Sequence, residues 1–216
     1  MSKDTTAYCF ETGNDEAERL ALEECVKRHR ISQRVSVLVT PAGNCELAIK
    51  FARLGAHVMV LDKAATKREV EGRILANEQH DNITFQETDL AKLPDILPGE
   101  PFDIIVVRRG LCGMPYQQAR KAVRKLLLNL KIGGRLYVSI LGLHSAIGEG
   151  YPHSEEIVEQ RFSALNPALA KKYEINHPVC LYSERNLFML LVDAGASVLR
   201  TLTTSYGNVK AVAVRV

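Results

Sequence analysis

The residues of this sequence best suited to chemistry are a short polar turn and an acidic side chain that follows it. The turn occupies residues 40–44 (TPAGN), and the acidic side chain is Asp62. Each comes directly after an apolar run typical of a β-strand, Val35 to Val39 and His57 to Leu61. A turn that opens a helix can receive a charged ligand, and a carboxylate about 20 residues further on can hold ribose hydroxyls. The pattern therefore predicts a site for a nucleoside cofactor.

Three further side chains could act at the same edge of a sheet. His144 follows the fifth predicted strand, and it is the best candidate for a general base because histidine titrates near neutral pH. Arg108 and Arg109 follow the fourth predicted strand and could bind an acidic group through charge-assisted hydrogen bonds. Two alternatives stay open: His144 could be structural, and one arginine could pair with a structural carboxylate.

The elements that must position these residues begin with a βαβ unit from Ser36 to Asp62. Apolar side chains recur at helical spacing from Leu47 to Leu54, and Gly55 is a typical helix stop. Before this unit, acidic residues followed by basic residues predict a helix over 15–29, with Asn14 as its N-cap. This helix could act as a lid over the cofactor or cover one flank of the sheet, and we favour the second role.

The middle of the chain continues the alternation of helices and strands. Thr66 to Glu69 match a capping box, which predicts a helix to about Gln79. A short strand follows over 83–86, with Asp89 just beyond it. The run 103–107 (DIIVV) predicts a buried strand in the middle of a parallel sheet.

Later elements include a second long helix and a change of pattern. Pro115 could occupy the first position of a helix to about Leu130, which Gly133 and Gly134 could stop before a strand over 135–141. Residues 142–182 are rich in glycine, histidine and proline. They predict a substrate-facing insertion with short helical pieces near 155–165 and 167–173.

The chain ends with a helix and two strand-like runs. The predicted helix spans 184–194, with Ser183 as its N-cap and Gly195 as its stop. The runs 197–204 and 209–216 lie close enough for a hairpin. A hairpin there would place an antiparallel pair at the end of an otherwise parallel sheet.

Composition predicts one domain over 1–216. The chain has 216 residues and a net charge of +3, with basic residues spread among acidic ones, so a nucleic-acid surface is not expected. The sequence shows neither an apolar stretch of membrane-spanning length nor a signal pattern, which predicts a cytoplasmic protein without a membrane partner. Five cysteines without a C-x-x-C pair predict reduced thiols and no metal site. A homodimer is left open.

The order of elements, the terminal hairpin and the segment LLLNLKIGGRLYVSILG (126–142) resemble class I S-adenosylmethionine-dependent methyltransferases. This resemblance implies a three-layer α/β sandwich with a Rossmann-like sheet of seven strands, mostly parallel, whose C-terminal strand is antiparallel. It also implies S-adenosylmethionine as cofactor. The first turn would approach the methionine part, and the acidic residues after the second and third strands would bind ribose and lie near adenine. The cofactor residues carried over by position are Thr40, Pro41, Ala42, Gly43, Asp62, Lys63, Asp89, Leu90 and Arg108.

The first turn departs from the family pattern of an acidic residue followed by alternating glycines. Val39 replaces the acidic residue, and Pro41 and Cys45 replace two glycines, so only Gly43 remains. Proline fixes its φ and has no N–H, whereas glycine permits close approach of the backbone. A degenerate glycine motif therefore predicts weak cofactor binding.

Three functions follow from these observations. The first is methyl transfer from S-adenosylmethionine to a small-molecule or protein side-chain acceptor, since the Asn/Asp-Pro-Pro-aromatic signature is replaced by Arg108 to Leu111. The second is a catalytically inactive binding or regulatory module with the methyltransferase fold. The third, less favoured because the glycine fingerprint is poor, is a nicotinamide-dependent oxidoreductase.

Overall fold

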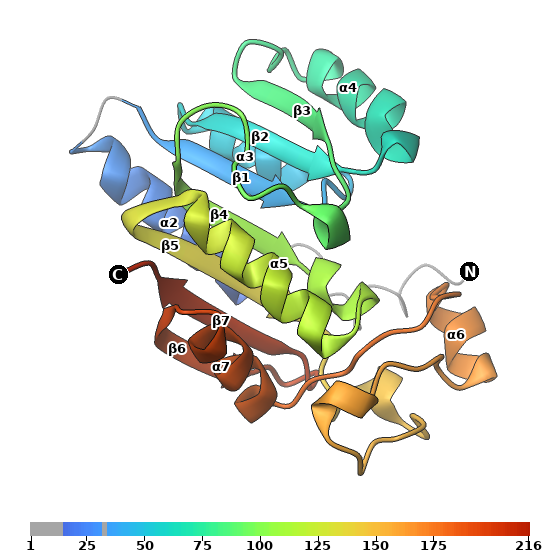
Figure 1. Cartoon of the computed structure of the whole chain (residues 1–216). Helices are drawn as coiled ribbons and strands as arrows, with labels where there is room; N and C mark the ends of the chain where they lie inside the picture. The colour runs from blue at the N-terminus through green and yellow to red at the C-terminus, as the bar shows by residue number, and fades with distance from the viewer. Residues whose placement is uncertain (1–14, 32–33) are drawn as a thin grey trace.

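Seven strands form one sheet in the order β3-β2-β1-β4-β5-β7-β6 (Figure 1). The computed structural model describes residues 15–31 and 34–216. Neighbouring strands from β3 to β5 are parallel, whereas β7 is antiparallel to both β5 and β6. The strands are β1 (Ser36–Thr40), β2 (His57–Asp62), β3 (Ile83–Glu87), β4 (Phe102–Arg108), β5 (Leu130–Ile140), β6 (Ser197–Thr203) and β7 (Val209–Val214). The predicted sheet and its antiparallel C-terminal strand are confirmed.

Helices cover both faces of this sheet, which makes three layers; α5 lies in front of the sheet and α2 and α3 behind it in Figure 1. The helices are α2 (Glu16–His29), α3 (Glu46–Arg53), α4 (Lys67–Ala76), α5 (Tyr116–Leu128), α6 (Pro167–Tyr173) and α7 (Glu184–Asp193). Short 3-10 helices occupy Ala64–Thr66, Leu90–Lys92, Gly110–Gly113, Ala146–Gly148 and Val158–Gln160.

Two hydrophobic cores result from the alternation of side chains along the central strands. In β4, Ile105 and Val107 belong to the core beneath α5 and α7, whereas Ile104 and Val106 belong to the core beneath α2, α3 and α4. Successive side chains of a strand point to opposite faces, so a strand buried on both sides must be apolar throughout. The buried run DIIVV is thus the centre of the sheet, as its sequence predicts.

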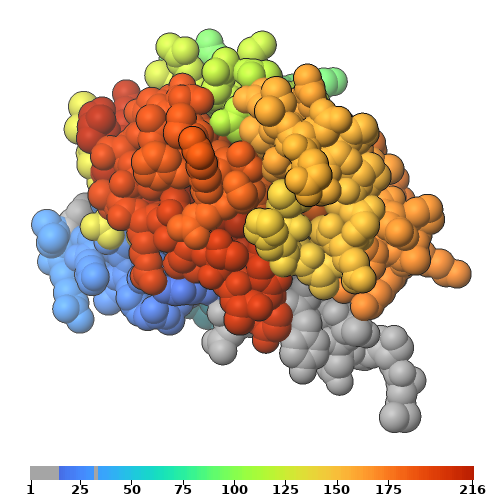
Figure 2. All heavy atoms as spheres, turned by 90° about the horizontal axis from the view of Figure 1, so that it is seen from below, coloured from blue at the N-terminus to red at the C-terminus, as the bar shows by residue number. Residues whose placement is uncertain are grey.

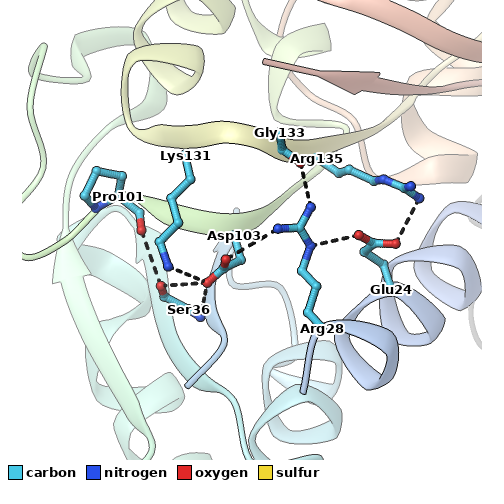
Figure 3. A network of polar contacts seen from close by, with 8 residues as sticks. All are labelled: Glu24, Arg28, Ser36, Pro101, Asp103, Lys131, Gly133 and Arg135. Atoms are coloured by element: carbon cyan, nitrogen blue, oxygen red, sulfur yellow. Dashed lines mark hydrogen bonds and ion pairs between the residues drawn. The ribbon is translucent and has the colours of Figure 1, made fainter. Parts of the chain in front are cut away.

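Polar contacts tie the C-terminal half of α2 to the amino-terminal edge of the sheet (Figure 3). Arg28 contacts Glu24 at 2.8 Å, Asp103 at 3.4 Å and the carbonyl of Gly133 at 2.6 Å. Glu24 also pairs with Arg135 of β5 at 2.9 Å. The helix is therefore fixed as a cover on one flank of the sheet.

Asp103, near the start of β4, is the shared acceptor of this network. Its Oδ2 accepts a hydrogen bond from the backbone N–H of Ser36 at 2.9 Å and another from Lys131 Nζ at 2.8 Å. Asp103 is 8% exposed, so its charge is held by these donors rather than by bulk water. It links β1, β4, β5 and α2 at one point.

Helix α4 begins directly after Thr66, as predicted, but two details of the predicted helix starts are wrong. The Thr66 side chain makes no capping bond, because Thr66 already has helical dihedrals in a 3-10 turn and its hydroxyl donates to the carbonyl of Lys63. Pro115 is the N-cap of α5 rather than its first helical residue. Asn14 lies outside the described residues. The side chain of Asp15 caps α2 by accepting from the N–H groups of Ala17 and Glu18.

Two further boundaries differ from the prediction. Helix α5 ends at Leu128, and Gly133 and Gly134 lie inside β5, where the pairing with β4 shifts register. Gly133 adopts a φ of 74°, which a glycine accepts without strain. In the insertion, the region 155–165 contains only the 3-10 helix Val158–Gln160, whereas α6 matches the second predicted piece.

The insertion 142–182 packs beside the C-terminal elements and forms a continuous surface with them (Figure 2, yellow to orange beside red). Arg161, 7% exposed, joins it to α7 by donating to Asn186 at 2.9 Å and to the carbonyl of Leu181 at 3.2 Å. The Tyr151 hydroxyl donates to the carbonyls of Val179 and Arg161. The insertion is therefore an ordered part of the domain.

Candidate active site

A cavity of about 700 Å³ opens at the carboxyl-terminal edge of the sheet. It lies where β1, β2 and β4 end and where the segment after β3 crosses over them, the usual ligand position in an open α/β sheet. The lining residues are Thr40, Pro41, Leu61, Asp62, Lys63, Thr88, Asp89, Leu90, Ala91, Arg108, Arg109, Gly110, Cys112, Gly113, Met114, Leu141, Ile175, His177 and Val179. Most residues predicted for the cofactor are therefore brought together.

The first turn meets the cavity through Thr40 and Pro41, whereas Ala42 and Gly43 are not part of the lining. Gly43 has a φ of 52°, and Cys45, the N-cap of α3, has a φ of 63°. A left-handed backbone at a non-glycine residue is uncommon. Cys45 thus keeps the backbone form that glycine would adopt at this place, with its side chain fully buried.

Asp62 forms hydrogen bonds that the sequence does not reveal. Its Oδ2 accepts from the backbone N–H of Ala42 at 3.0 Å, and its Oδ1 accepts from the N–H of Lys63 at 2.8 Å. The carboxylate therefore joins the end of β2 to the first turn. A carboxylate has about four acceptor positions, so these two bonds leave capacity for hydroxyl donors of a ligand.

Asp89 begins the 3-10 turn after β3. Its Oδ1 accepts from the N–H of Ala91 at 3.0 Å, and its Oδ2 lies 3.7 Å from Lys63 Nζ. The lysine side chain is 69% exposed, so this ion pair contributes little to stability. Asp89 and Asp62 both border the cavity, with Lys63 between them.

The sequence left open whether one of the two arginines pairs with a structural carboxylate. In the structure Arg108 does so. Its Nε lies 2.8 Å from Oε1 of Glu18 in α2, although the two are not aligned as a hydrogen bond. Glu18 is 8% exposed. Burial raises the pKa of its carboxyl group, and the positive charge of Arg108 partly opposes that shift. Arg109 also lines the cavity; it has a φ of 58°, and its N–H donates to the carbonyl of Ser139 at 2.7 Å.

The start of α2 is anchored by a second buried pair. Asp15 Oδ1 lies 3.0 Å from Lys210 Nζ of β7, and its Oδ2 accepts from the Ser139 hydroxyl at 3.3 Å. Lys210 is 2% exposed. The first turn of α2, which carries Glu18, is therefore held against the sheet beside Arg108.

His144 is placed away from the cavity lining. It is exposed, and its backbone carbonyl lies against Gly207 in the turn between β6 and β7, where a Cβ would collide with it. The histidine that lines the cavity is His177, whose Nε2 would lie 3.8 Å from a Cβ built on Gly113. Sequence reasoning missed His177 because its segment returns to the site only through tertiary packing.

The far end of the cavity is apolar. Met114, Leu141, Ile175 and Val179 line it together with Cys112, whose Sγ accepts from the N–H of Leu141 at 3.1 Å. Burial raises the pKa of the Cys112 thiol to about 12, so it stays protonated and is a poor nucleophile. This end suits an apolar portion of a ligand.

A larger groove of about 850 Å³ lies between α2 and α3. Its lining is mainly charged, including Glu16, Glu23, Lys50 and Arg53. It lies on the helical flank rather than at the strand ends and contains neither Asp62 nor Asp89. We therefore assign the candidate active site to the smaller cavity, where loops from several strands converge.

Residues 37–134 match the family model described as a methyltransferase domain. The matched segment contains β1 to β4 and most of the residues that line the cavity. No curated protein matches the sequence. Over the matched segment, just under half of the chain, the sequence is similar to the methyltransferase family, and the sheet order is that of the class I, Rossmann-like fold.

Solved structures agree on this fold. An S-adenosylmethionine-dependent methyltransferase of Methanosarcina mazei is 18% identical with a TM-score of 0.67, over 88% of this chain and 97% of that one. Magnesium protoporphyrin IX methyltransferase of Synechocystis PCC 6803, solved with bound S-adenosylhomocysteine, is 20% identical with a TM-score of 0.63, over 93% and 84%.

An O-methyltransferase family protein of Burkholderia thailandensis is 16% identical with a TM-score of 0.66. The match covers 99% of this chain but 60% of that one, so this chain spans less than two thirds of the relative's length. At these identities the likeness establishes the fold. Among the residues that the structure describes, no helix combines the length and apolar character needed to cross a membrane.

Proposed function

We propose that the protein binds S-adenosylmethionine in the strand-end cavity and transfers its methyl group to a small-molecule or protein side-chain acceptor. The observation that carries this proposal is the placement of Asp62 and Asp89 on one cavity of about 700 Å³ at the carboxyl ends of the strands. Both carboxylates follow parallel strands of a methyltransferase domain, where a nucleoside is bound at the switch in strand order.

The residues present fit this cofactor. Asp62 would accept the ribose hydroxyls through the lone pairs that Ala42 and Lys63 do not use, and Asp89 would lie near the adenine. Lys63 and Leu90 would border the nucleoside, and Thr40, Pro41 and Arg108 would surround the methionine part. Ala42 and Gly43, which do not line the cavity, stay predictions from the sequence. The bound sulfonium supplies an activated methyl group. The chain then has to align an acceptor, exclude water and accept a proton where the acceptor carries one.

The acceptor would occupy the apolar end of the cavity, near Met114, Ile175 and Val179. For proton removal, His144 stays a prediction from the sequence, although it lies outside the cavity lining. His177 lines the cavity, and we favour it for this role. Once an acceptor is known, His177→Ala should lower kcat far more than His144→Ala; the reverse order would support the prediction from sequence. A cytoplasmic location, a homodimer and an acceptor other than nucleic acid also stay predictions.

Calorimetric titration with S-adenosylmethionine and S-adenosylhomocysteine tests the cofactor site. We expect binding by the intact protein and at least a tenfold loss in Asp62→Ala, because both the ribose acceptor and the anchor of the first turn are removed. Asp81→Ala is the matched control, since that carboxylate is exposed before β3 and outside the cavity. Absence of binding by the intact protein would refute the proposal.

A second candidate function is a binding or regulatory module that retains the fold without turnover. It is favoured by Pro41, which offers no N–H to a ligand, and by Cys45, which stands where the family pattern has a glycine. Replacing both residues by glycine separates the two functions. A large gain in cofactor affinity would indicate a degenerate site, whereas methyl transfer by the unmodified protein in an acceptor screen would exclude an inactive module.

A further inference from the structure

Helix α7 is apolar on two sides, although only one of them packs against the sheet. Its inner side carries three leucines, all of which are buried. Its outer side carries Phe188, Met189 and Val192, each 41% exposed, which form one stripe because residues three and four apart are neighbours on a helix. Among the helices that the structure describes, no other exposes more than one large apolar side chain. A helix that is apolar all round is normally covered on every side.

The edge strand β6 extends this outer face of α7. Glu184, in the first turn of α7, accepts hydrogen bonds from the hydroxyls of Thr201 and Thr203 at 2.8 and 2.9 Å, so helix and strand lie side by side. Leu199 of the same strand is 54% exposed and lies where the pairing with β7 shifts register. These elements form the lower end of the molecule in Figure 1, and Figure 2 views the molecule from that end. The strand adds to the surface that a partner could cover, since a stable interface buries about 800 Å² per copy.

We propose that two copies of this chain associate through the outer face of α7, with the two helices antiparallel across a two-fold axis near Met189. The charges at the ends of the stripe support a second copy as the partner. Arg185 lies four residues before Met189, and Asp193 lies four residues after it. An antiparallel copy centred on Met189 therefore brings each Arg185 opposite the partner's Asp193. The face is thus complementary to itself, as a two-fold interface requires.

The two charges are not explained by the helix that carries them. Arg185 is the second residue of α7 and Asp193 is the last, whereas the helix dipole favours acidic residues at the start and basic residues at the end. Both side chains are exposed, and within the described part of the chain neither has a hydrogen bond or an ion pair. In the antiparallel pair each charge faces an opposite charge, and the two helix dipoles also oppose each other.

The dimensions of packed helices are compatible with this arrangement. Helix axes pack about 8–10 Å apart, and four residues of a helix span about 6 Å. Each ion pair would therefore lie about 6 Å along the helix from the two-fold axis, at the rim of the apolar contact. Pairs at a rim fix register and orientation more than affinity, so the apolar side chains would supply most of the binding energy.

Sedimentation velocity of the full chain without ligand, from about 1 to 200 µM, tests the interface. We expect a reversible dimer. Met189→Glu should raise its dissociation constant at least about tenfold, because the substitution places two like charges beside the two-fold axis in an apolar contact. Leu75→Glu is the matched control, since Leu75 is 67% exposed on α4, beside the opposite edge of the sheet. It should leave the dissociation constant unchanged.

Charge reversal tests the antiparallel register. Arg185→Glu and Asp193→Arg each place like charges opposite one another at both ends of the interface, so each alone should weaken the dimer about tenfold. The double variant exchanges the two charges and should return to within about threefold of the intact protein. Both substitutions give the helix the charge order that its dipole favours, so a weaker dimer would not result from unfolding, which circular dichroism checks.

The remaining outcomes overturn the proposal. A monomer at every concentration would leave the outer face of α7 to a different protein. A dimer that Met189→Glu does not weaken would use another surface, and single reversals without recovery in the double variant would exclude the antiparallel register. Assemblies larger than a dimer would indicate a head-to-tail contact in place of a two-fold interface. Because α7 contributes no residue to the lining of the candidate active site, none of these outcomes depends on the proposed function.

Discussion

Asp103 should be one of the main polar contributors to stability, and Asp103→Ala tests this. The substitution removes the acceptor of the Ser36 N–H bond at 2.9 Å and of the Lys131 contact at 2.8 Å, and it also removes the 3.4 Å contact with Arg28 (Figure 3). A hydrogen bond to a charged group contributes about 1.5–3 kcal/mol. The Lys131 side chain is 38% exposed, so solvent reduces its contribution to below about 1 kcal/mol.

Together these terms predict a loss of about 2–4 kcal/mol in the free energy of unfolding. For a domain of this size each kcal/mol lowers Tm by about 2–4 °C, so the melting temperature should fall by roughly 5–15 °C. Urea unfolding followed by circular dichroism measures the difference directly. Asp103→Asn retains an oxygen acceptor for the Ser36 N–H and should lose less, about 1–2 kcal/mol.

The control is Asp81→Ala, whose side chain is 87% exposed and whose loss should cost less than about 0.5 kcal/mol. The reasoning is refuted if Asp103→Ala is no more destabilising than this control. Folded Asp103→Ala should still bind S-adenosylhomocysteine within about twofold of the intact protein. Asp103 lies at the amino-terminal edge of the sheet, away from the cavity.

Three further predictions concern other parts of the molecule. Burial raises the pKa of the Cys112 thiol to about 12, against an ordinary value of 9.0, so above about pH 9 unfolding releases its proton. The free energy of unfolding, measured by urea titration, should therefore be lower at pH 10 than at pH 8. Equal values at the two pH values would contradict this. Gly110→Ala would place a Cβ 2.8 Å from Leu90 and 3.2 Å from Pro41, so we expect a loss of about 1–3 kcal/mol and weaker cofactor binding by calorimetry. Ser183→Ala removes the capping box with Asn186 and should cost about 1 kcal/mol in urea unfolding, whereas no change would show that the cap is replaced by water.

The alkaline prediction has a definite sign. A thiol whose pKa is raised on folding keeps its proton in the native state while the unfolded chain loses it, so the unfolded state binds fewer protons and stability falls as pH rises.

Burial likewise raises the pKa of Cys25 and Cys180 to about 11. A thiol reagent at pH 8 should therefore modify these cysteines only after denaturant is added, and rapid modification of the native protein would contradict the burial argument.

The regular elements were predictable because they depend on local patterns. Alternation and runs of apolar residues defined the strands, helical spacing defined α3, and Ser183 with its following residues formed the expected cap of α7. The antiparallel strand β7 followed from two strand-like runs close in sequence.

The errors arose where two local signals competed. Gly133 and Gly134 can end a helix, yet here they form the register shift in β5 because pairing with β4 outweighs the local preference.

The sequence by itself therefore determined the order of strands and helices, the methyltransferase-like fold and the acidic residues that end β2 and precede the turn after β3. Only the tertiary structure decided which distant groups meet. It paired Glu18 with Arg108 and brought the N–H of Ala42 within hydrogen-bond distance of Asp62. It also placed His177 in the cavity lining and left His144 outside. The physical reason is that periodicity records the environment of each residue along its own element. The partners of a charged side chain are fixed by packing between elements far apart in the chain.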